Sequence, residues 1–217
     1  MITGRNNFHD PDALAQRLAV NVASSLRQAI ASKSHGVLAV SGGTTPQKFF
    51  EHLSQQGLDW QHVTITLIDE RQVDETSTRS NARLVKAALI QNQASVANFV
   101  PLFQNPAAAE IADFDVAILG MGNDGHTASF FPRGDTLAEA LSDAAPPLLE
   151  ISAPGSGEPR ITWSLSKILS AKEIILHIQG TDKVATLDKV LANGDVMEMP
   201  VRAVLRSPKP VEIYWCP

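Results

Sequence analysis

Short apolar runs alternate with helical patterns along most of this chain, and few folds accommodate that alternation. Each run is continuous, which is typical of a strand buried on both faces of a parallel sheet. We therefore expect right-handed β-α-β crossovers and an α/β fold: a Rossmann-like, doubly wound, mostly parallel sheet flanked by helices. The expected strands are residues 37–40, 63–68, 116–119, 148–151, 174–178, 201–205 and 211–215. The expected helices are a long one that begins at Asp10 and Pro11, followed by residues 46–53, 81–90, 137–141, 164–169 and 183–191.

Length and composition favour one compact domain over residues 1–217. Hydrophobic residues make up 44% of the chain and charged residues 19%, which suits a single core and excludes disorder. The stretches at residues 105–107 and 154–159 are expected to be loops, since each is short and lies between core-like runs. We expect a monomer or a weak homodimer.

Charge and hydropathy limit the expected partners. The net charge of -5 offers no basic field that would hold a nucleic acid. No apolar stretch approaches the ~18 residues of a membrane span, and the first residues lack the apolar region of a signal peptide. We therefore expect a cytoplasmic protein with neither a nucleic-acid nor a membrane partner.

Polar or glycine-rich segments follow the apolar runs at residues 41–46, 69–71, 120–126 and 180–183. Each segment lies just after an expected strand, and the carboxyl ends of parallel strands meet at one edge of an open α/β sheet. Ligands bind at that edge. The four segments are therefore expected to form one site.

The first segment reads Ser41-Gly42-Gly43-Thr44-Thr45-Pro46. Its glycines can turn backbone N–H groups toward an anion, and the helix that follows adds positive potential at its amino end. A phosphate group would suit this loop. The segment is neither a Walker A loop nor a dinucleotide fingerprint, and ordinary turn chemistry remains an alternative explanation.

The second segment, Asp69-Glu70-Arg71, places three charges at the mouth of the expected sheet. Arg71 could meet an anionic or polarised substrate oxygen, and the carboxylates could orient it or bind sugar hydroxyls. The alternative is a solvated loop with a local ion pair.

The third segment contains a literal GxGxxG at Gly120, Gly122 and Gly125. A dinucleotide fingerprint needs a long helix that opens at the third glycine, whereas Pro132 and Gly134 interrupt this segment within about two turns. The pattern therefore disfavours a nicotinamide cofactor.

The same segment places His126 beside the acidic Asp124 at a strand end. A lone histidine is more often structural than catalytic, but an imidazole so placed can take a proton from water. We expect His126 to be a general base.

Cations elsewhere in the chain could bind an anionic substrate. Lys183 lies in the first turn of an expected helix with Thr181 as N-cap, where a bound anion would offset the unfavourable helix dipole. The alternative is that Lys183 points into solvent or pairs with Asp182. Arg160 and Arg202 could complete an anion pocket or be surface charges.

Other chemistries find little support in the sequence. The histidines are scattered without an HExxH pattern, and the single cysteine, Cys216, has no CxxC partner, so we expect no metal. No GxSxG nucleophile elbow occurs, which disfavours an acyl-enzyme. Direct attack by water is the chemistry that remains.

Taken together, these residues resemble the 6-phosphogluconolactonases, within the wider superfamily of glucosamine-6-phosphate isomerases. The resemblance runs from about residue 10 to the end, and residues 124–129 are its most specific part. The sequence departs from the family pattern at Ile68, where an aromatic is common, and at Asp74, where a proline is common. The residues that carry the resemblance are Ser41-Gly42-Gly43-Thr44, Asp69-Glu70-Arg71 with Ser80-Asn81, Gly122 through Pro132, Arg160-Ile161-Thr162, and Gly180 with Lys183.

The resemblance implies hydrolysis of 6-phospho-D-glucono-1,5-lactone to 6-phosphogluconate, the second step of the oxidative pentose phosphate pathway, with no metal or organic cofactor. By the same resemblance His126 is the general base, and Asp69 and Arg71 line the sugar site. The implied phosphate-binding residues are Gly42, Gly43 and Thr44 of the first loop, with Arg160 and Lys183 as cationic partners.

Two other functions stay open. A glucosamine-6-phosphate deaminase would share the sheet and both loops, but Arg71 and the Thr127-Ala128-Ser129 continuation favour the lactonase. A non-enzymatic sugar-phosphate sensor would need an output module, and no helix-turn-helix segment or basic extension is evident.

Overall fold

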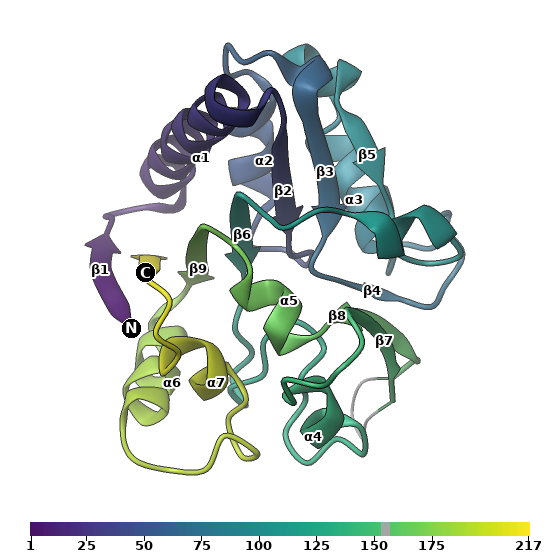
Figure 1. Cartoon of the computed structure of the whole chain (residues 1–217). Coiled ribbons are helices and arrows are strands. Elements are labelled where there is room, and N and C mark those ends of the chain that lie inside the picture. The colour runs from purple at the N-terminus through teal and green to yellow at the C-terminus, as the bar shows by residue number, and fades with distance from the viewer. Residues whose placement is uncertain (153–156) are drawn as a thin grey trace.

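A seven-stranded sheet forms the centre of the molecule, and its strand pairings are parallel (Figure 1). The computed structural model describes residues 1–152 and 157–217. The strands are β1 (Ile2–Asn7), β2 (Gly36–Val40), β3 (Val63–Leu67), β5 (Asn98–Val100), β6 (Val116–Leu119), β9 (Glu173–Gln179) and β10 (Val211–Cys216). They lie in the order β1-β10-β9-β6-β2-β3-β5.

This strand order reverses the direction of winding between β2 and β6. From β2 the chain winds through β3 to β5, then returns to β6 on the other side of β2 and continues through β9 to β10. The doubly wound parallel sheet expected from the sequence is therefore confirmed. The point of reversal opens a crevice between neighbouring strand ends, where ligands bind in such sheets.

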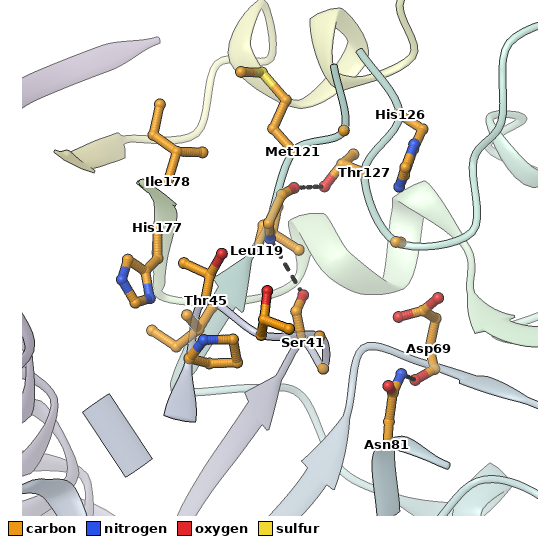
Figure 2. Close-up of a pocket in the computed structure, with 18 of the residues that line it drawn as sticks. Ser41, Thr45, Asp69, Asn81, Leu119, Met121, His126, Thr127, His177 and Ile178 are labelled. Atoms are coloured by element: carbon orange, nitrogen blue, oxygen red, sulfur yellow. Dashed lines mark hydrogen bonds between the residues drawn. The ribbon is translucent and has the colours of Figure 1, made fainter. Parts of the chain in front are cut away.

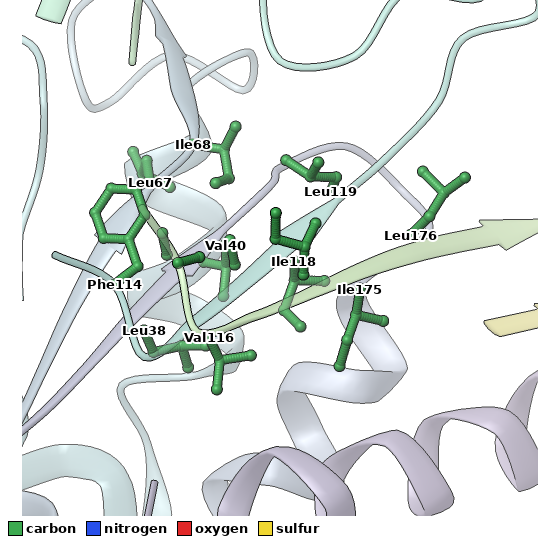
Figure 3. Close-up of a cluster of buried hydrophobic side chains, with 14 of the residues drawn as sticks. Leu38, Val40, Leu67, Ile68, Phe114, Val116, Ile118, Leu119, Ile175 and Leu176 are labelled. Carbon is green, nitrogen blue, oxygen red and sulfur yellow. The ribbon is translucent and has the colours of Figure 1, made fainter. Parts of the chain in front are cut away.

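The central strands are buried on both faces of the sheet, which explains their continuous apolar runs. Figure 3 shows side chains of β2 and β6 packed with those of β3 and β9. Leu38 is paired with Val116 and Val40 with Ile118, and all four side chains are almost inaccessible to solvent. Burial of each such side chain contributes roughly 1.5–3 kcal/mol to folding.

The first helix, α1 (Pro11–Lys33), begins as the sequence predicts. One carboxylate oxygen of Asp10 accepts the backbone N–H groups of Asp12 and Ala13, each at 2.8 Å, and Pro11 occupies the first helical position. In Figure 1, α1 lies beside α2. No helix in the described part of the chain is long and apolar enough to cross a membrane. The other expected helices lie within two residues of their expected bounds. They are α2 (Gln47–Ser54), α3 (Asn81–Ala88), α4 (Leu137–Ala140), α5 (Leu165–Leu169) and α6 (Thr181–Leu191).

A smaller antiparallel sheet lies at the edge of the main one and was not expected. Its order is β4-β8-β7, with β4 at Asp69–Arg71, β7 at Leu148–Ile151 and β8 at Arg160–Trp163. Residues 148–151 are a strand as expected, but they pair with β8 rather than with the parallel sheet. The sheet carries Asp69, Arg71 and Arg160 on neighbouring strands.

Residues 201–205 form helix α7 (Val201–Leu205), so the strand expected there is wrong. A run of this length has no decisive period, and tertiary contacts decide its conformation. Pro200 precedes the helix, and the Val201 backbone N–H donates to the Gly125 carbonyl at 2.9 Å.

The structure can be compared with both loops expected from the sequence, at residues 105–107 and 154–159. Residues 106–107, expected to be irregular, open a 3₁₀ helix at Pro106–Glu110, and Asn105 Oδ1 accepts the Ala107 N–H. Two further 3₁₀ helices lie at Trp60–His62 and Asn92–Val96. Of the loop expected at residues 154–159, positions 154–156 lie outside the described residues.

Candidate active site

One cavity of about 280 Å³ lies at the carboxyl ends of the parallel strands, beside the reversal between β2 and β6. In Figure 2, His126, Asp69 and Ser41 lie around the same space although they come from three segments. All four segments expected to meet contribute to its lining. The expected residues that line it are Ser41, Gly42, Gly43, Thr44, Asp69, Arg71, His126, Arg160 and Lys183.

The loop after β2 is tightly fitted against its neighbours. Ser41 Oγ accepts the Gly120 N–H at 3.3 Å, which joins this loop to the one after β6 (Figure 2). A Cβ on Gly42 would lie 2.0 Å from Asn81 Oδ1, and Gly43 has a φ of 90°. Both positions therefore require glycine.

The backbone of this loop can receive an anion. Within the described residues, the N–H groups of Gly42, Gly43 and Thr44 take part in no hydrogen bond. All three residues line the cavity. Unpaired backbone N–H groups at a strand-to-helix turn are the donors that bind phosphate in α/β proteins.

The glycines of the GxGxxG pattern make room for a histidine. A Cβ on Gly122 would lie 2.1 Å from His126 Nδ1 and 2.4 Å from Asp124 Oδ1. Gly125 has a φ of 80°, and a Cβ there would meet Met199 at 2.7 Å. The Gly122 N–H donates to the His126 carbonyl at 2.8 Å and closes the loop. The pattern therefore reflects packing around His126.

Features of a dinucleotide or metal site are missing from the described part of the chain. The next helix after Gly125 is α4, which begins only at Leu137. A pyrophosphate site would need a longer helix opening at the third glycine. Within residues 1–152 and 157–217, no group of three or more His, Cys, Asp or Glu side chains could hold a metal ion.

His126 and Asp124 form a close pair. His126 Nδ1 lies 2.6 Å from Asp124 Oδ1, and the imidazole is about one-third exposed, at 33%. The hydrogen bond from His126 lowers the pKa of Asp124 to about 2, so Asp124 is a carboxylate at neutral pH. An ionised acceptor holds the proton on Nδ1 and leaves Nε2 with a free lone pair. In this tautomer Nε2 is the ring nitrogen that can accept a proton.

Asp69 lies in a buried network on the other wall. Its Oδ2 accepts the Ser129 hydroxyl at 2.6 Å and lies 3.7 Å from Arg160 Nη1. The Arg160 guanidinium lies over the Phe131 ring, 5.3 Å from its centroid, and the His126 ring is 4.7 Å from the same centroid. Burial lowers the pKa of Arg160. Asp69 and Arg160 are thus fixed relative to residues 120–131, the histidine loop.

The interpretation of residues 69–71 as a solvated loop is wrong, because they form β4 and both carboxylates are buried. Glu70 does not line the cavity, and its carboxylate accepts the N–H groups of Asn81 and Ala82 at 2.8 and 2.7 Å, which caps α3. Burial raises the pKa of Glu70. Arg71 lines the cavity, and one Nη atom donates to the Arg79 carbonyl.

Lys183 lies in the first turn of α6 and lines the cavity, as expected. The N-cap lies one residue earlier than the sequence predicts, at Gly180 rather than Thr181, and the helix begins at Thr181 rather than at residue 183. Arg202 is neither in the site nor on the surface. Its guanidinium is buried and donates to three backbone carbonyls, those of Lys189, Val190 and Asp195.

Three further residues line the cavity to which the sequence had assigned no site role, and of these only Asn81 had been named as part of the family resemblance. His177 and Gln179 lie at the carboxyl end of β9, and Asn81 lies at the start of α3 with its amide donating to the Asp69 carbonyl at 3.0 Å (Figure 2). The position of His177 and Gln179 at a strand end was the available signal. Burial lowers the pKa of His177 to about 4, and its ring contacts Phe49 edge-on.

Comparison with known proteins identifies the family. The sequence model of the family described as glucosamine-6-phosphate isomerases/6-phosphogluconolactonase matches residues 9–215. The chain belongs to this family. The residues matched by the family model include every residue that lines the cavity.

Relatives with the name 6-phosphogluconolactonase resemble the chain over nearly its whole length. The one from Rhizobium meliloti is 46% identical over 225 residues, with 97% of each chain covered. The one from Mesorhizobium japonicum is 47% identical and covers 98% of this chain and 94% of its own. The crystal structure of a 6-phosphogluconolactonase from Shewanella baltica superimposes with a TM-score of 0.95 at 40% identity, covering 99% and 98% of the two chains.

Proposed function

We propose that this chain hydrolyses 6-phospho-D-glucono-1,5-lactone to 6-phospho-D-gluconate, a step of the oxidative pentose phosphate pathway. The activity is the one named in its relatives. The observation that carries the proposal is the His126–Asp124 pair, which lies at a cavity that also presents unpaired backbone N–H groups and Lys183.

The phosphate of the substrate binds the loop of residues 41–45 in this proposal. Gly42, Gly43 and Thr44 donate their backbone N–H groups, and Lys183 and Arg160 supply positive charge. Both cations line the same cavity as the loop. Anchoring the phosphate places the lactone carbonyl beside His126, and such positioning lowers the entropic part of the barrier.

His126 acts as the general base. Asp124 holds the proton on Nδ1, so Nε2 takes a proton from a water molecule that attacks C1 of the lactone. The C1 oxyanion that forms is stabilised by Arg71 or by backbone N–H groups. Collapse of the tetrahedral intermediate breaks the bond from C1 to the ring oxygen, and the ring oxygen takes up the proton that His126 removed from the water, which restores the base. Asp69 binds sugar hydroxyls on the opposite wall.

The proposed reaction uses a sugar-phosphate lactone and water, with neither a metal nor an organic cofactor. A single domain over residues 1–217, a monomeric or weakly dimeric state, a cytoplasmic location and the absence of nucleic-acid and membrane partners stay predictions.

The lactone assay separates this function from its alternatives. 6-Phosphogluconolactone is generated in situ from glucose 6-phosphate, and its decay is followed with and without the protein. The proposal predicts faster decay with the protein. Ammonia release from glucosamine 6-phosphate would instead indicate the deaminase. Binding of both compounds with turnover of neither would indicate a sensor.

A further inference from the structure

The histidine loop and the start of α6 are joined by a side-chain hydrogen bond that the proposed mechanism does not use. Asn123 Nδ2 donates to Asp182 Oδ2 at 2.8 Å, although 59 residues separate the two in sequence. Thr186 Oγ1 lies 3.4 Å from the Asn123 carbonyl and adds a second, longer contact between the same segments. Both Asn123 and Asp182 are exposed, and each adjoins a residue that lines the cavity, Gly122 and Lys183.

Each end of this contact adjoins a group of the site. Asn123 is followed by Asp124, whose carboxylate orients His126. Asp182 is followed by Lys183, which lines the cavity from the first turn of α6. The hydrogen bond therefore spans the gap between the segment that carries the base and the segment that carries a phosphate-binding cation.

The backbone around Asp182 is shaped to allow the contact. Gly180 has a φ of 107°, and a Cβ there would lie 2.6 Å from Asp182 Oδ1. The hydrogen bond from Asn123 lowers the pKa of Asp182, so Asp182 is a charged acceptor at neutral pH. On its other side, the histidine loop is held by α7 through the bond from the Val201 N–H to the Gly125 carbonyl.

We propose that Asn123 and Asp182 are positioning residues, whose hydrogen bond sets the separation between His126 and Lys183. This inference rests on the proposed function. A substrate anchored by its phosphate presents C1 to His126 only at one separation, and a displacement of about 1 Å can cost up to about 100-fold in rate. An exposed hydrogen bond contributes little to folding, so the role should appear in catalysis rather than in stability.

Asn123→Asp tests the contact by placing two carboxylates against each other. We expect kcat for the lactone to fall about 10-fold, while KM changes less than about threefold because the phosphate site is intact. Asn123→Ala, which removes the bond without repulsion, should fall between the wild type and Asn123→Asp. Asp182→Asn keeps an acceptor oxygen for Asn123 and should stay within about threefold of the wild type.

The double variant Asn123→Asp with Asp182→Asn restores a donor and a charged acceptor with the roles exchanged. We expect its kcat to return to within about threefold of the wild type. The matched control is Asn21→Asp, because Asn21 Nδ2 donates to Glu173 Oε1 at the same 2.8 Å, but at the amino end of β9, away from the cavity. That change should leave kcat unaltered.

The outcomes separate this inference from the proposed function. If Asn123→Asp and Asn123→Ala keep the wild-type kcat, or if the double variant is as slow as Asn123→Asp, the positioning role is wrong while the lactonase stands. A wild-type protein that does not hydrolyse the lactone overturns both. Thermal unfolding of each variant shows whether a loss of kcat comes from loss of fold, and we expect midpoints within a few degrees of the wild type.

Discussion

Asp124 Oδ1 accepts two hydrogen-bond donors of His126, the ring Nδ1 at 2.6 Å and the backbone N–H at 3.1 Å. One carboxylate oxygen thus fixes both the tautomer of the imidazole and the turn that carries it. The pKa of Asp124 is lowered to about 2, so the carboxylate stays charged across the pH range in which an ordinary imidazole titrates.

Asp124→Asn should lower kcat at least about 10-fold, since the amide no longer holds the reactive tautomer or stabilises the imidazolium that forms. KM should change less than about threefold, because the phosphate-binding groups are untouched. Steady-state kinetics on the lactone measure both. A kcat within twofold of the wild type would show that Asp124 does not support the base.

Gly122→Ala should abolish most activity, because its Cβ would occupy space now held by His126 Nδ1 and Asp124 Oδ1. Gly57→Ala is the control, since a Cβ at Gly57 meets nothing within 4 Å. The lactone assay and a thermal melt are run on both proteins. Full activity in Gly122→Ala would mean that the loop glycines do not serve the histidine.

Lys183→Gln should raise KM for 6-phosphogluconolactone about 10-fold or more, the effect of losing one charge-assisted contact to phosphate. The kcat/KM of the variant for unphosphorylated gluconolactone should stay within about twofold of the wild-type value, because that substrate has no phosphate for Lys183 to bind. The ratio of kcat/KM for the two substrates measures the difference. An equal effect on both lactones would place Lys183 outside the phosphate site.

His177 predicts a dependence of stability on pH. Burial lowers its pKa from 6.5 to about 4, so the unfolded chain binds a proton that the folded chain excludes. Exclusion of this proton costs nothing above pH 6.5 and lowers the free energy of unfolding as the pH falls toward 4. The decrease amounts to about 2 kcal/mol between pH 7 and pH 5. Urea unfolding at both pH values should show a smaller decrease in the free energy of unfolding for His177→Leu than for the wild type. Equal losses in the two proteins would mean that His177 titrates normally when folded.

The main sheet could be predicted because its central strands are covered on both faces, which leaves a continuous apolar run in the sequence. Strand β1 could not be predicted, since its residues are mostly polar and alternate between half-buried and exposed at the sheet edge. Strand β8 was not predicted because it contains Arg160, whose burial depends on Asp69 and Phe131 from other segments. The run at residues 201–205 was too short to distinguish a strand from a helix.

The location of the site followed from the strand ends, since four polar segments after strands line one cavity. The burial of Arg202 could not be foreseen, because its acceptors are carbonyls that only the packing of α6 and α7 brings together. The contact between Asn123 and Asp182 was hidden for the same reason. Pairings across the fold leave no periodic signal in the sequence.

In the proposed mechanism His126 activates water for attack on the lactone, and His126→Ala removes that base. The decay of 6-phosphogluconolactone generated in situ is compared without protein, with the wild type and with the variant, after a thermal melt has shown that the variant is folded. We predict that the wild type accelerates decay and that the variant loses roughly 100-fold or more of that acceleration. Undiminished acceleration by His126→Ala would show that His126 is not the general base.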